Sequence, residues 1–505
     1  MLSKTVGLST LIILTTTVAI LATTANTTSS QQPPSVEAWK AGQSKNDRQE
    51  HRVGPLPWAA RQDPIHESYA GNFPIRQWTS KDGFYWFFPA LKPKVKNPPL
   101  IIWLQGGPGA SSMIGLFYET GPIHVTEDLK LVRNNNTWAN EYSMLFVEQP
   151  VGTGYSFVDQ GGKQRTKRKK ESARGASKRR GRGTKAGNNT DEDPDAMYTK
   201  SGYVKDQRAV VKDMMVFLDQ FYERYPEQQK ADLYIAGQSY AGKFIPSIAH
   251  AIMERNKKIQ SKLPQNQAVI PIKGISMGNS MTDPITQIQI HADHAFYLGL
   301  LTTHQADQMR EYQSNAVKLA EQGRFLDANR FRGKIFNIFR NSTGQLNTFD
   351  IRKGSHGMNW KSMTALLNRP ETKDSLNVFG PRKVPCGGDI MRSTKPLVAD
   401  LLNNGVKVLV YQGIFDFRDA PAGSTRWIEG MDWKGKEEFE KTERKVWKVG
   451  GYTAGYVNSV MGKGKERGGL TRVVVLGGGH YTPMDESENS LVMIRHLIDG
   501  TPLDE

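Results

Sequence analysis

Short apolar runs that alternate with longer helical patterns constrain the fold of this chain more than any other feature of its sequence. Each run is rich in β-branched residues and is bounded by Gly, Pro or polar residues, as buried strands of parallel sheets are. The runs are Leu100–Leu104, Met144–Glu148, Leu233–Ala236, Ile270–Ser276, Val406–Tyr411 and Val473–Leu476. The helical patterns between or after them are Tyr203–Tyr225, Ala241–Glu254 and Glu486–Ile498. This alternation predicts an α/β fold with a mostly parallel central sheet that helices cover on both faces.

Residues 291–398 interrupt the alternation. They contain two helical patterns, Thr303–Gln322 and Phe325–Phe339, joined by long polar connections without a clear strand. A block of this kind between two strands of an α/β sheet is expected to be a helical insertion that caps one end and shapes the substrate pocket. We therefore expect a signal peptide (1–25), an N-terminal extension (26–60), a first core part (61–290, with a basic insertion at 161–200), the helical cap (291–398) and a second core part (399–505).

The sequence Gly237-Gln238-Ser239-Tyr240-Ala241-Gly242 joins one of the expected strands to the helical pattern that follows it. Small residues around Ser239 permit a sharp turn that lifts the serine hydroxyl above the edge of the sheet. The pattern is a variation of the G-x-S-x-G nucleophile elbow of α/β-hydrolases. The alternative is a tight turn with an incidental serine. We favour a nucleophile because the groups that it needs follow later in the chain.

A serine nucleophile needs a base to take its proton and an acid to orient that base. Asp416 follows the run that ends at Tyr411, and His480 follows the run that ends at Leu476 and three glycines. The carboxyl ends of parallel strands meet at one edge of a sheet, so these residues can reach Ser239 despite the distance in sequence. Asp419 competes with Asp416 but lies further from the strand end. His291 and His294 lack an H-E-x-x-H metal motif and are expected to be structural.

The run Leu100–Leu104 leads into Gln105-Gly106-Gly107-Pro108-Gly109. Glycines at a strand end let backbone N–H groups approach a ligand closely, which is how an early loop of this fold contributes to an oxyanion hole. The backbone N–H groups of Gly107 and Tyr240 are the expected pair.

The N-terminus has the layout of a secretory signal peptide. Lys4 precedes an apolar stretch from Val6 to Ala22, and small residues around Ala25 offer a cleavage site. The alternative is an uncleaved anchor; with cleavage, no stable membrane span remains in the mature chain. The single cysteine, Cys386, permits no internal disulfide and is expected to be buried.

Three sequons, which begin at Asn135, Asn188 and Asn341, are compatible with a glycosylated exterior. We therefore expect a secreted or lysosomal (vacuolar) protein.

The net charge of +17 is concentrated in one place. The segment Lys163–Lys185 holds twelve Lys and Arg against Glu171 alone, and therefore contributes +11. It is rich in Gly, Ser and Ala and has no aromatic residue on which a base could stack. The charge therefore does not indicate a nucleic-acid partner. We expect a solvated loop, with a processing site, a polyanion contact or a retained intron as the alternatives.

Several longer motifs, in the right order, resemble the serine carboxypeptidase family, most closely its vitellogenic-like members. The matching stretches are Trp103-Leu104-Gln105-Gly106-Gly107-Pro108-Gly109-Ala110-Ser111-Ser112, Gln149-Pro150-Val151-Gly152-Thr153-Gly154-Tyr155-Ser156, Gly237–Gly242, Gly430-Met431-Asp432-Trp433-Lys434-Gly435, and Gly478-Gly479-His480 with Pro483. The resemblance covers roughly residues 60–500. It implies an α/β-hydrolase that removes single residues from the C-termini of peptides and proteins through an acyl-enzyme, often in acidic compartments, without a metal or cofactor.

The resemblance also implies a hydrogen-bond network for the substrate's terminal carboxylate. Residue by residue, this role falls on Trp103, Gln105, Gly106, Glu119 and Gln238. Gln238 stands where the family usually has Glu. An amide has N–H donors and no proton to lose, so we expect it to favour the charged form of Glu119.

Further departures from the family are Glu148 in place of the commoner Asp, polar residues at Arg418 and Asp419, and the missing disulfides. None of them removes a triad or oxyanion residue. The sequence therefore predicts a serine carboxypeptidase with Ser239 as nucleophile, His480 as base and Asp416 as orienting acid. An esterase or acyltransferase with the same machinery, or a weakened homologue that only binds, are the alternatives.

Overall fold

The computed structural model describes residues 47–54, 56, 67–76, 81–158, 197–199, 202–261, 268–376, 378, 389–464 and 467–503. The expected signal peptide, the basic segment 163–185 and position 386 lie outside these residues. The chain divides into two compact units, Met1–Asp47 and Arg48–Glu505, and the description below concerns the second. Within the described part of the chain, no helix combines the length and apolar character needed to cross a membrane.

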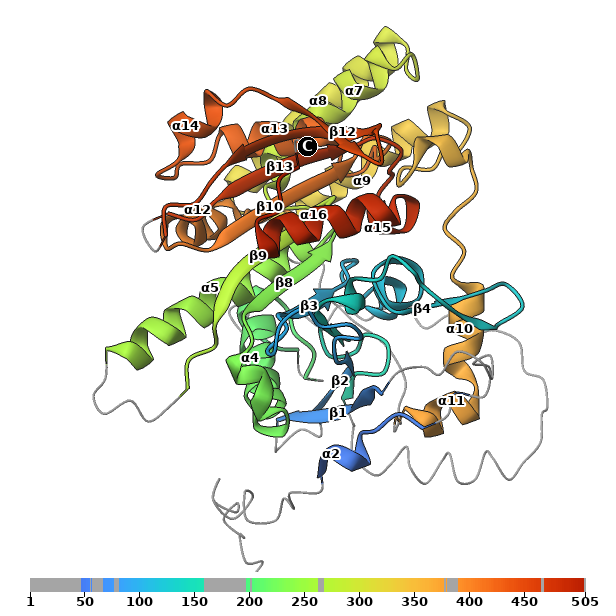
Figure 1. Cartoon of the computed structure of the whole chain (residues 1–505). Coiled ribbons are helices and arrows are strands. Elements are labelled where there is room, and N and C mark those ends of the chain that lie inside the picture. Colours follow the sequence, from blue (N-terminus) through green and yellow to red (C-terminus); the bar gives the residue numbers. More distant parts are fainter. Residues whose placement is uncertain are drawn as a thin grey trace, which may run out of the picture. The chain divides into compact units, whose positions relative to one another are not determined.

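An 11-stranded sheet forms the centre of the unit (Figure 1). The six expected strands are neighbours in its middle, in the order β6, β3, β8, β9, β10, β13, and every adjacent pair among them is parallel. Their bounds are β6 Ser143–Val147, β3 Leu100–Leu104, β8 Leu233–Gln238, β9 Ile272–Gly278, β10 Lys407–Gly413 and β13 Leu470–Val475. The expectation of a mostly parallel central sheet is therefore confirmed, and the boundaries agree to within a few residues.

The flanks of the sheet are antiparallel and were not predicted from the sequence. On one side, β1 (Tyr69–Arg76) pairs with β2 (Lys81–Phe88), which pairs with β6 and with the short β7 (Phe157–Val158). On the other side, β12 (Tyr452–Val460) joins β13 to β11 (Lys445–Val449). A separate two-stranded sheet contains β4 (Ile123–Val125) and β5 (Leu131–Arg133).

Helices cover both faces of the sheet because successive strand residues point to opposite sides. In β3, Leu100, Ile102 and Leu104 belong to one apolar cluster, whereas Ile101 and Trp103 belong to another. The first cluster includes residues of α4 (Gln207–Arg224), α5 (Ala241–Gln260), α12 (Lys395–Asn403) and α13 (Pro421–Glu429). The second includes residues of α16 (Ser487–Asp499) and α10 (Lys361–Asn368). Three short helices outside these clusters' main helices and outside the block described next are α2 (Asp47–Glu50), α14 (Lys436–Glu440) and α15 (Thr482–Asp485).

Between β9 and β10 the chain adds a mostly helical block. It begins with α6 (Pro284–Gln287) and α7 (His291–Tyr297), continues with the long helices α8 (Thr303–Glu321) and α9 (Phe325–Ser342), and includes α10 and α11 (Pro370–Ser375) before α12 returns to the sheet. Residues of α8 and α9 form an apolar cluster of their own, which also contains Phe417 from the loop after β10. The rings of Phe339 and Phe417 stack with their centroids 3.8 Å apart. Helix α9 is thereby packed onto the loop that carries Asp416.

Candidate active site

The turn between β8 and α5 holds Ser239 in a strained conformation. Its φ of 62° is unusual for a residue with a side chain. Its N–H donates to Gly278 O at 3.0 Å, and its carbonyl accepts from Met281 N at 2.9 Å. A Cβ on Gly237 would lie 2.0 Å from Leu104 O, so the strand can pass there only as glycine. This is the geometry expected of a nucleophile elbow, and Ser239 is partly exposed at its tip.

Asp416 and His480 lie side by side at the ends of two adjacent strands, β10 and β13. His480 Nδ1 is 2.8 Å from Asp416 Oδ2, and both side chains are almost completely buried. The loops themselves touch, because a Cβ on Gly413 would lie 2.2 Å from Gly479 O. Asp419 Oδ2 is 3.8 Å from the same His480 nitrogen. The preference for Asp416 over Asp419 as the hydrogen-bonding acid therefore agrees with the geometry.

Asn279 is a site residue that the sequence reasoning missed. Its Nδ2 donates to Asp416 Oδ2 at 2.8 Å, and its Oδ1 accepts from Thr482 Oγ1 at 2.7 Å. Its φ of 42° places it in the left-handed region, where Asn is tolerated better than most residues. Asn279 thereby ties the acid to the segment that follows His480. Its position just after the expected strand Ile270–Ser276 was the available signal.

The helical block contributes directly to the position of His480. Phe349 O accepts the backbone N–H of His480 at 2.7 Å, and the Phe349 ring lies 4.8 Å from the imidazole. Thr348 O accepts the N–H groups of Phe417 and Arg418, at 3.2 and 2.9 Å. The segment 348–349 is therefore attached to both loops that carry the acid and the base.

The glycine loop after β3 lies against the elbow. A Cβ on Gly106 would be 2.5 Å from Tyr240 N, so any side chain there would collide with the backbone of the turn. Gly107 is exposed and has a φ of 105°. Glu148 supports the far end of the loop, because its carboxylate accepts from Ser111 Oγ at 2.5 Å and from Ser112 N at 3.2 Å. The longer acid that departs from the family pattern thus has a specific task.

A buried cluster of one carboxyl group and two amides lies next to the elbow. Gln238 Nε2 donates to Glu119 Oε1 at 3.1 Å, and Gln105 Nε2 donates to the same oxygen at 3.3 Å. The indole N–H of Trp103 donates to Gln105 Oε1 at 2.9 Å. Trp103 is completely buried, and its hydrogen bond orients the Gln105 amide.

Glu119 ends a π-helical turn, Gly115–Glu119, and is 1% exposed. Burial raises its pKa to about 8, although the hydrogen bonds from Gln105 and Gln238 act in the opposite direction. Its Oε2 has no hydrogen-bond partner among the described residues. The hydrogen bond from Gln238 favours the charged form of Glu119, as expected, but the loss of solvation outweighs the two neutral donors. At acidic to neutral pH the carboxyl group is protonated and can itself donate through Oε2.

Other titratable residues singled out by type lie outside this arrangement. His291 is buried between Ile288 O and Arg418 O, and burial lowers its pKa to about 4. It therefore serves as a neutral structural link to the loop of Asp416.

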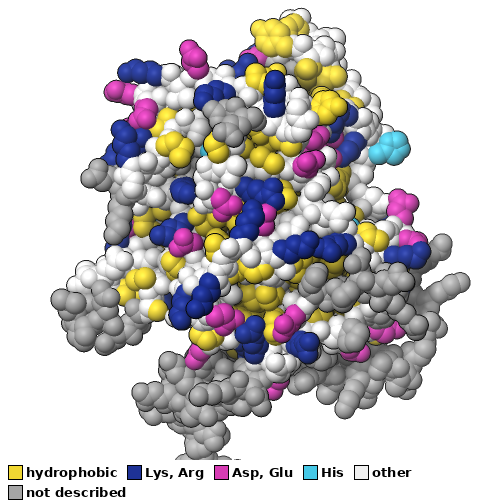
Figure 2. All heavy atoms as spheres, in the orientation of Figure 1, with side chains coloured by type: hydrophobic (Ala, Val, Ile, Leu, Met, Phe, Trp, Pro, Cys, Tyr) yellow, Lys and Arg dark blue, Asp and Glu magenta, His cyan; other side chains and the backbone are white. Residues whose placement is uncertain are grey.

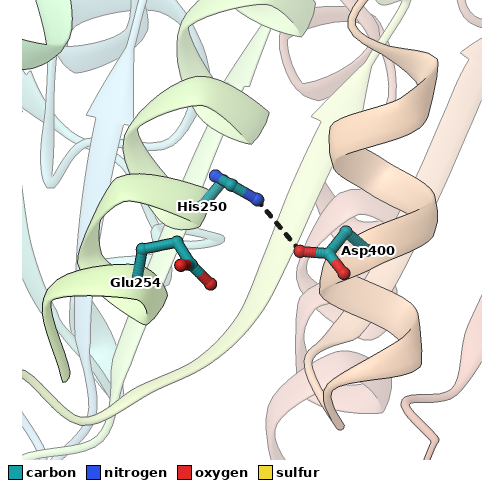
Figure 3. Close-up of side chains that lie close together, drawn as sticks. All are labelled: His250, Glu254 and Asp400. Atoms are coloured by element: carbon teal, nitrogen blue, oxygen red, sulfur yellow. Dashed lines mark hydrogen bonds and ion pairs between the residues drawn. The ribbon is translucent and has the colours of Figure 1, made fainter. Parts of the chain in front are cut away.

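His250 and Glu254 of α5 face Asp400 of α12, as Figure 3 shows, and His250 Nε2 lies 3.0 Å from Asp400 Oδ2. These three side chains are partly exposed, and Glu254 also pairs with Lys257 at 2.8 Å. The contact between His250 and Asp400 links the two helices and is remote in sequence from the triad loops.

Comparison with known proteins places these residues in a familiar context. A family model described as serine carboxypeptidase matches residues 57–500. The probable serine carboxypeptidase CPVL of Dictyostelium discoideum is 32% identical over 446 residues, which cover 86% of this chain and 79% of the relative. The human protein of the same name is 30% identical over 481 residues, 91% of this chain and 88% of the relative. The venom serine carboxypeptidase of Apis mellifera is 29% identical, over 85% of this chain and 83% of that protein.

Among solved structures, the prohormone-processing carboxypeptidase Kex1(Δ)P from Saccharomyces cerevisiae superposes with a TM-score of 0.70. The sequences are 24% identical, and the match covers 90% of this chain and 96% of the other. The expected α/β-hydrolase fold is confirmed by this likeness and by the sheet described above.

Proposed function

The chain belongs to the serine carboxypeptidase family and is a serine-type carboxypeptidase, and we propose that Ser239, His480 and Asp416 are the residues that carry out its reaction. The observation that supports this assignment best is the 2.8 Å contact between Asp416 and His480, on the strand ends beyond a serine held at a φ of 62°. Peptides and proteins with a free C-terminus are the substrates.

In this proposal, Ser239 Oγ attacks the carbonyl carbon of the last peptide bond while His480 Nε2 takes its proton. Asp416 holds the other imidazole nitrogen and stabilises the imidazolium, and Asn279 holds Asp416. The oxyanion is bound by the N–H groups of Gly107 and Tyr240, each worth about 3 kcal/mol in the transition state. Collapse of the intermediate expels the terminal amino acid, whose amine takes the proton from His480. Water then hydrolyses the acyl-enzyme by the same steps.

We propose that Glu119, Gln105 and Gln238 recognise the terminal carboxylate of the substrate. Gln238 is the neighbour of Ser239 in the chain, so the cluster lies beside the bond to be cleaved. A protonated Glu119 can donate to the substrate carboxylate, which an ionised one would repel. An esterase or acyltransferase would have no use for a buried group of this kind, and this separates the two readings of the same triad.

The exterior supports a destination in the secretory pathway, either extracellular or in a lysosomal or vacuolar lumen. Asn135 and Asn341, which begin two of the sequons, are both exposed and therefore accessible to glycosylation.

On the face shown in Figure 2, basic and acidic side chains of the described residues are interspersed. This mixed surface offers no continuous basic stripe of the kind that nucleic acids require.

The test compares an N-blocked dipeptide that has a free carboxylate with the same dipeptide as its C-terminal amide. The proposal predicts that the acid is cleaved at least about 100-fold more efficiently, since only it engages the Glu119 cluster. A fluorophosphonate probe should label Ser239 and no other residue. Equal cleavage of the two substrates, with normal labelling, would favour the esterase reading.

A further inference from the structure

Asp419 is a second buried carboxylate that faces the base. It lies in the same loop as Asp416, three residues further on, and its side chain is 3% exposed. Its Oδ2 is 3.8 Å from His480 Nδ1, compared with 2.8 Å for Asp416 Oδ2. Oxygen or nitrogen atoms of all three side chains lie within 4.8 Å of one another. The imidazole is therefore approached by two acids from one loop.

The two acids are satisfied very differently. The oxygens of Asp416 accept from His480, from Asn279 and from the backbone N–H groups of Arg418 and Asp419. By contrast, Oδ2 of Asp419 is buried and has no hydrogen-bond partner among the described residues. A buried carboxylate oxygen that holds nothing in place contributes little to the fold and costs solvation. Its presence beside the base calls for an explanation other than structural support.

Charged groups from several elements surround Asp419. Asp416 and Arg418 belong to its own loop, His480 to the loop after β13, Arg332 to α9 and Lys243 to α5. Burial raises the pKa of Asp419, and so does Asp416, whereas His480 and the two arginines oppose this rise. Arg332 is itself buried, and its pKa is lowered to about 9 by burial and by Arg418, with Asp419 acting in the opposite sense. Asp419 therefore interacts electrostatically with both the base and a buried cation of the helical block.

We propose that Asp419 is a positioning residue for His480, which supplies a second carboxylate to the imidazolium that forms when Ser239 gives up its proton. This inference rests on the proposed function, because it requires His480 to be the base. The proton moves from Ser239 Oγ to His480 Nε2 and later to the leaving amine. Neither carboxylate takes up this proton, so no additional reactant is involved.

The sign of the effect follows from electrostatics. An ionised carboxylate close to an imidazole ring favours the protonated form of that ring. The transition state, in which the imidazole carries the proton, is therefore stabilised. The same attraction places the acidic limb of the kcat profile, where activity falls as pH is lowered, at a higher pH.

Asp419→Asn keeps the shape of the side chain and removes its charge. It should move the acidic limb to lower pH by at least about half a unit, and lower the plateau kcat several-fold. KM should change less than about twofold, because the Glu119 cluster is untouched. Asp419→Glu should restore most of the limb position. Asp419→Ser, a smaller neutral side chain, should shift the limb as Asn does, and it replaces Asn if that variant fails to fold.

The experiment measures kcat for a blocked dipeptide from pH 3.5 to 8, and in parallel the rate of fluorophosphonate labelling of Ser239. The control is Asp213→Asn, a buried acid on α4 that pairs with Tyr198 at 2.9 Å. A shifted limb in both readouts for Asn or Ser, but not for the control, supports the inference. An unchanged limb overturns it. Labelling without dipeptide hydrolysis would instead show that the proposed peptidase function has failed, with the Asp419 comparison still measurable by labelling.

Discussion

Gln238 Nε2 lies 3.1 Å from Glu119 Oε1, so the residue before the candidate nucleophile donates a hydrogen bond to a buried carboxyl group. In relatives of the usual pattern a second acid would occupy position 238. Here the pair contains an amide, which donates a hydrogen bond and cannot ionise, and one acid whose pKa is about 8. We therefore expect this pairing to determine how substrate binding responds to pH.

We expect the KM of the wild type to stay nearly constant between pH 5 and 7.5 and to rise as Glu119 loses its proton near pH 8. Gln238→Glu places two acids within hydrogen-bonding distance, and two such carboxyl groups beside a substrate carboxylate cannot all ionise. The variant should therefore lose affinity within the range 5 to 7.5, with kcat affected less because His480 determines it. Parallel KM–pH curves for the two proteins would show that Glu119 alone dictates the response.

The same carboxyl group should make folding stability depend on pH. Burial raises the pKa of Glu119 from 4.5 to about 8, so the native state keeps a proton that the unfolded state releases. The stability from this proton is fully present below about pH 4.5 and is lost as pH rises through about 8. One such group contributes a slope of roughly 1.4 kcal/mol per pH unit inside that window.

Glu119→Gln should remove this slope from the free energy of unfolding, measured by urea denaturation between pH 5 and 7.5. Glu321→Gln, at an exposed position on α8, is the control and should leave the slope as it is. An identical pH dependence in the wild type and in Glu119→Gln would mean that Glu119 is ionised in the native state.

Asn279→Gly tests the support of the acid. Glycine accepts the φ of 42° without strain but removes the hydrogen bonds to Asp416 and Thr482. We expect kcat to fall on the order of 10- to 100-fold, with KM changed less than about twofold, as for other groups that orient a catalytic side chain. Thr482→Val, which removes the hydrogen bonds from Thr482 Oγ1 to Asn279 Oδ1 and to Gly479 O but leaves the one between Asn279 and Asp416, should cost less. A kcat within about twofold of the wild type for the glycine variant would show that Asp416 needs no such support.

An aromatic group between the substrate cluster and the base should influence specificity. The Trp360 ring lies 4.9 Å from that of Tyr118, the neighbour of Glu119, and 5.1 Å from that of Tyr481, the neighbour of His480. All three rings are partly exposed. Trp360→Ala should lower kcat/KM about 10-fold for dipeptides that end in Phe or Leu, and much less for those that end in Ala, because burial of a large apolar side chain contributes about 1.5–3 kcal/mol. A uniform loss for all substrates would place Trp360 outside the specificity pocket.

The six central strands could be predicted because a strand buried on both faces is a continuous apolar run. The flanking strands could not be predicted. β1 contains Asn72 and Pro74, and β11 carries Lys445 and Lys448 three positions apart, so neither is a continuous apolar run. The triad followed from strand ends and chain order. The roles of Asn279 and Asp419 depend on how loops curve after the strands, and periodicity carries no information about that.

The raised pKa of Glu119 could not be predicted from residue types. The donors of Gln105 and Gln238 could be counted from the sequence, but the degree of burial could not. Trp103 shows the same limit in another form. Its indole N–H donates to Gln105 Oε1 at 2.9 Å, a contact within the proposed carboxylate network that the sequence could not predict.

The central claim is that Ser239, activated by His480, cleaves the last peptide bond. The most direct test is the rate at which purified wild type, Ser239→Ala and His480→Ala release the terminal residue of a blocked dipeptide, with folding checked by circular dichroism. Loss of one triad member is expected to lower kcat on the order of 10⁶-fold, as in other serine proteases, while each variant stays folded. A correctly folded Ser239→Ala or His480→Ala protein that retained near-normal turnover would contradict the account.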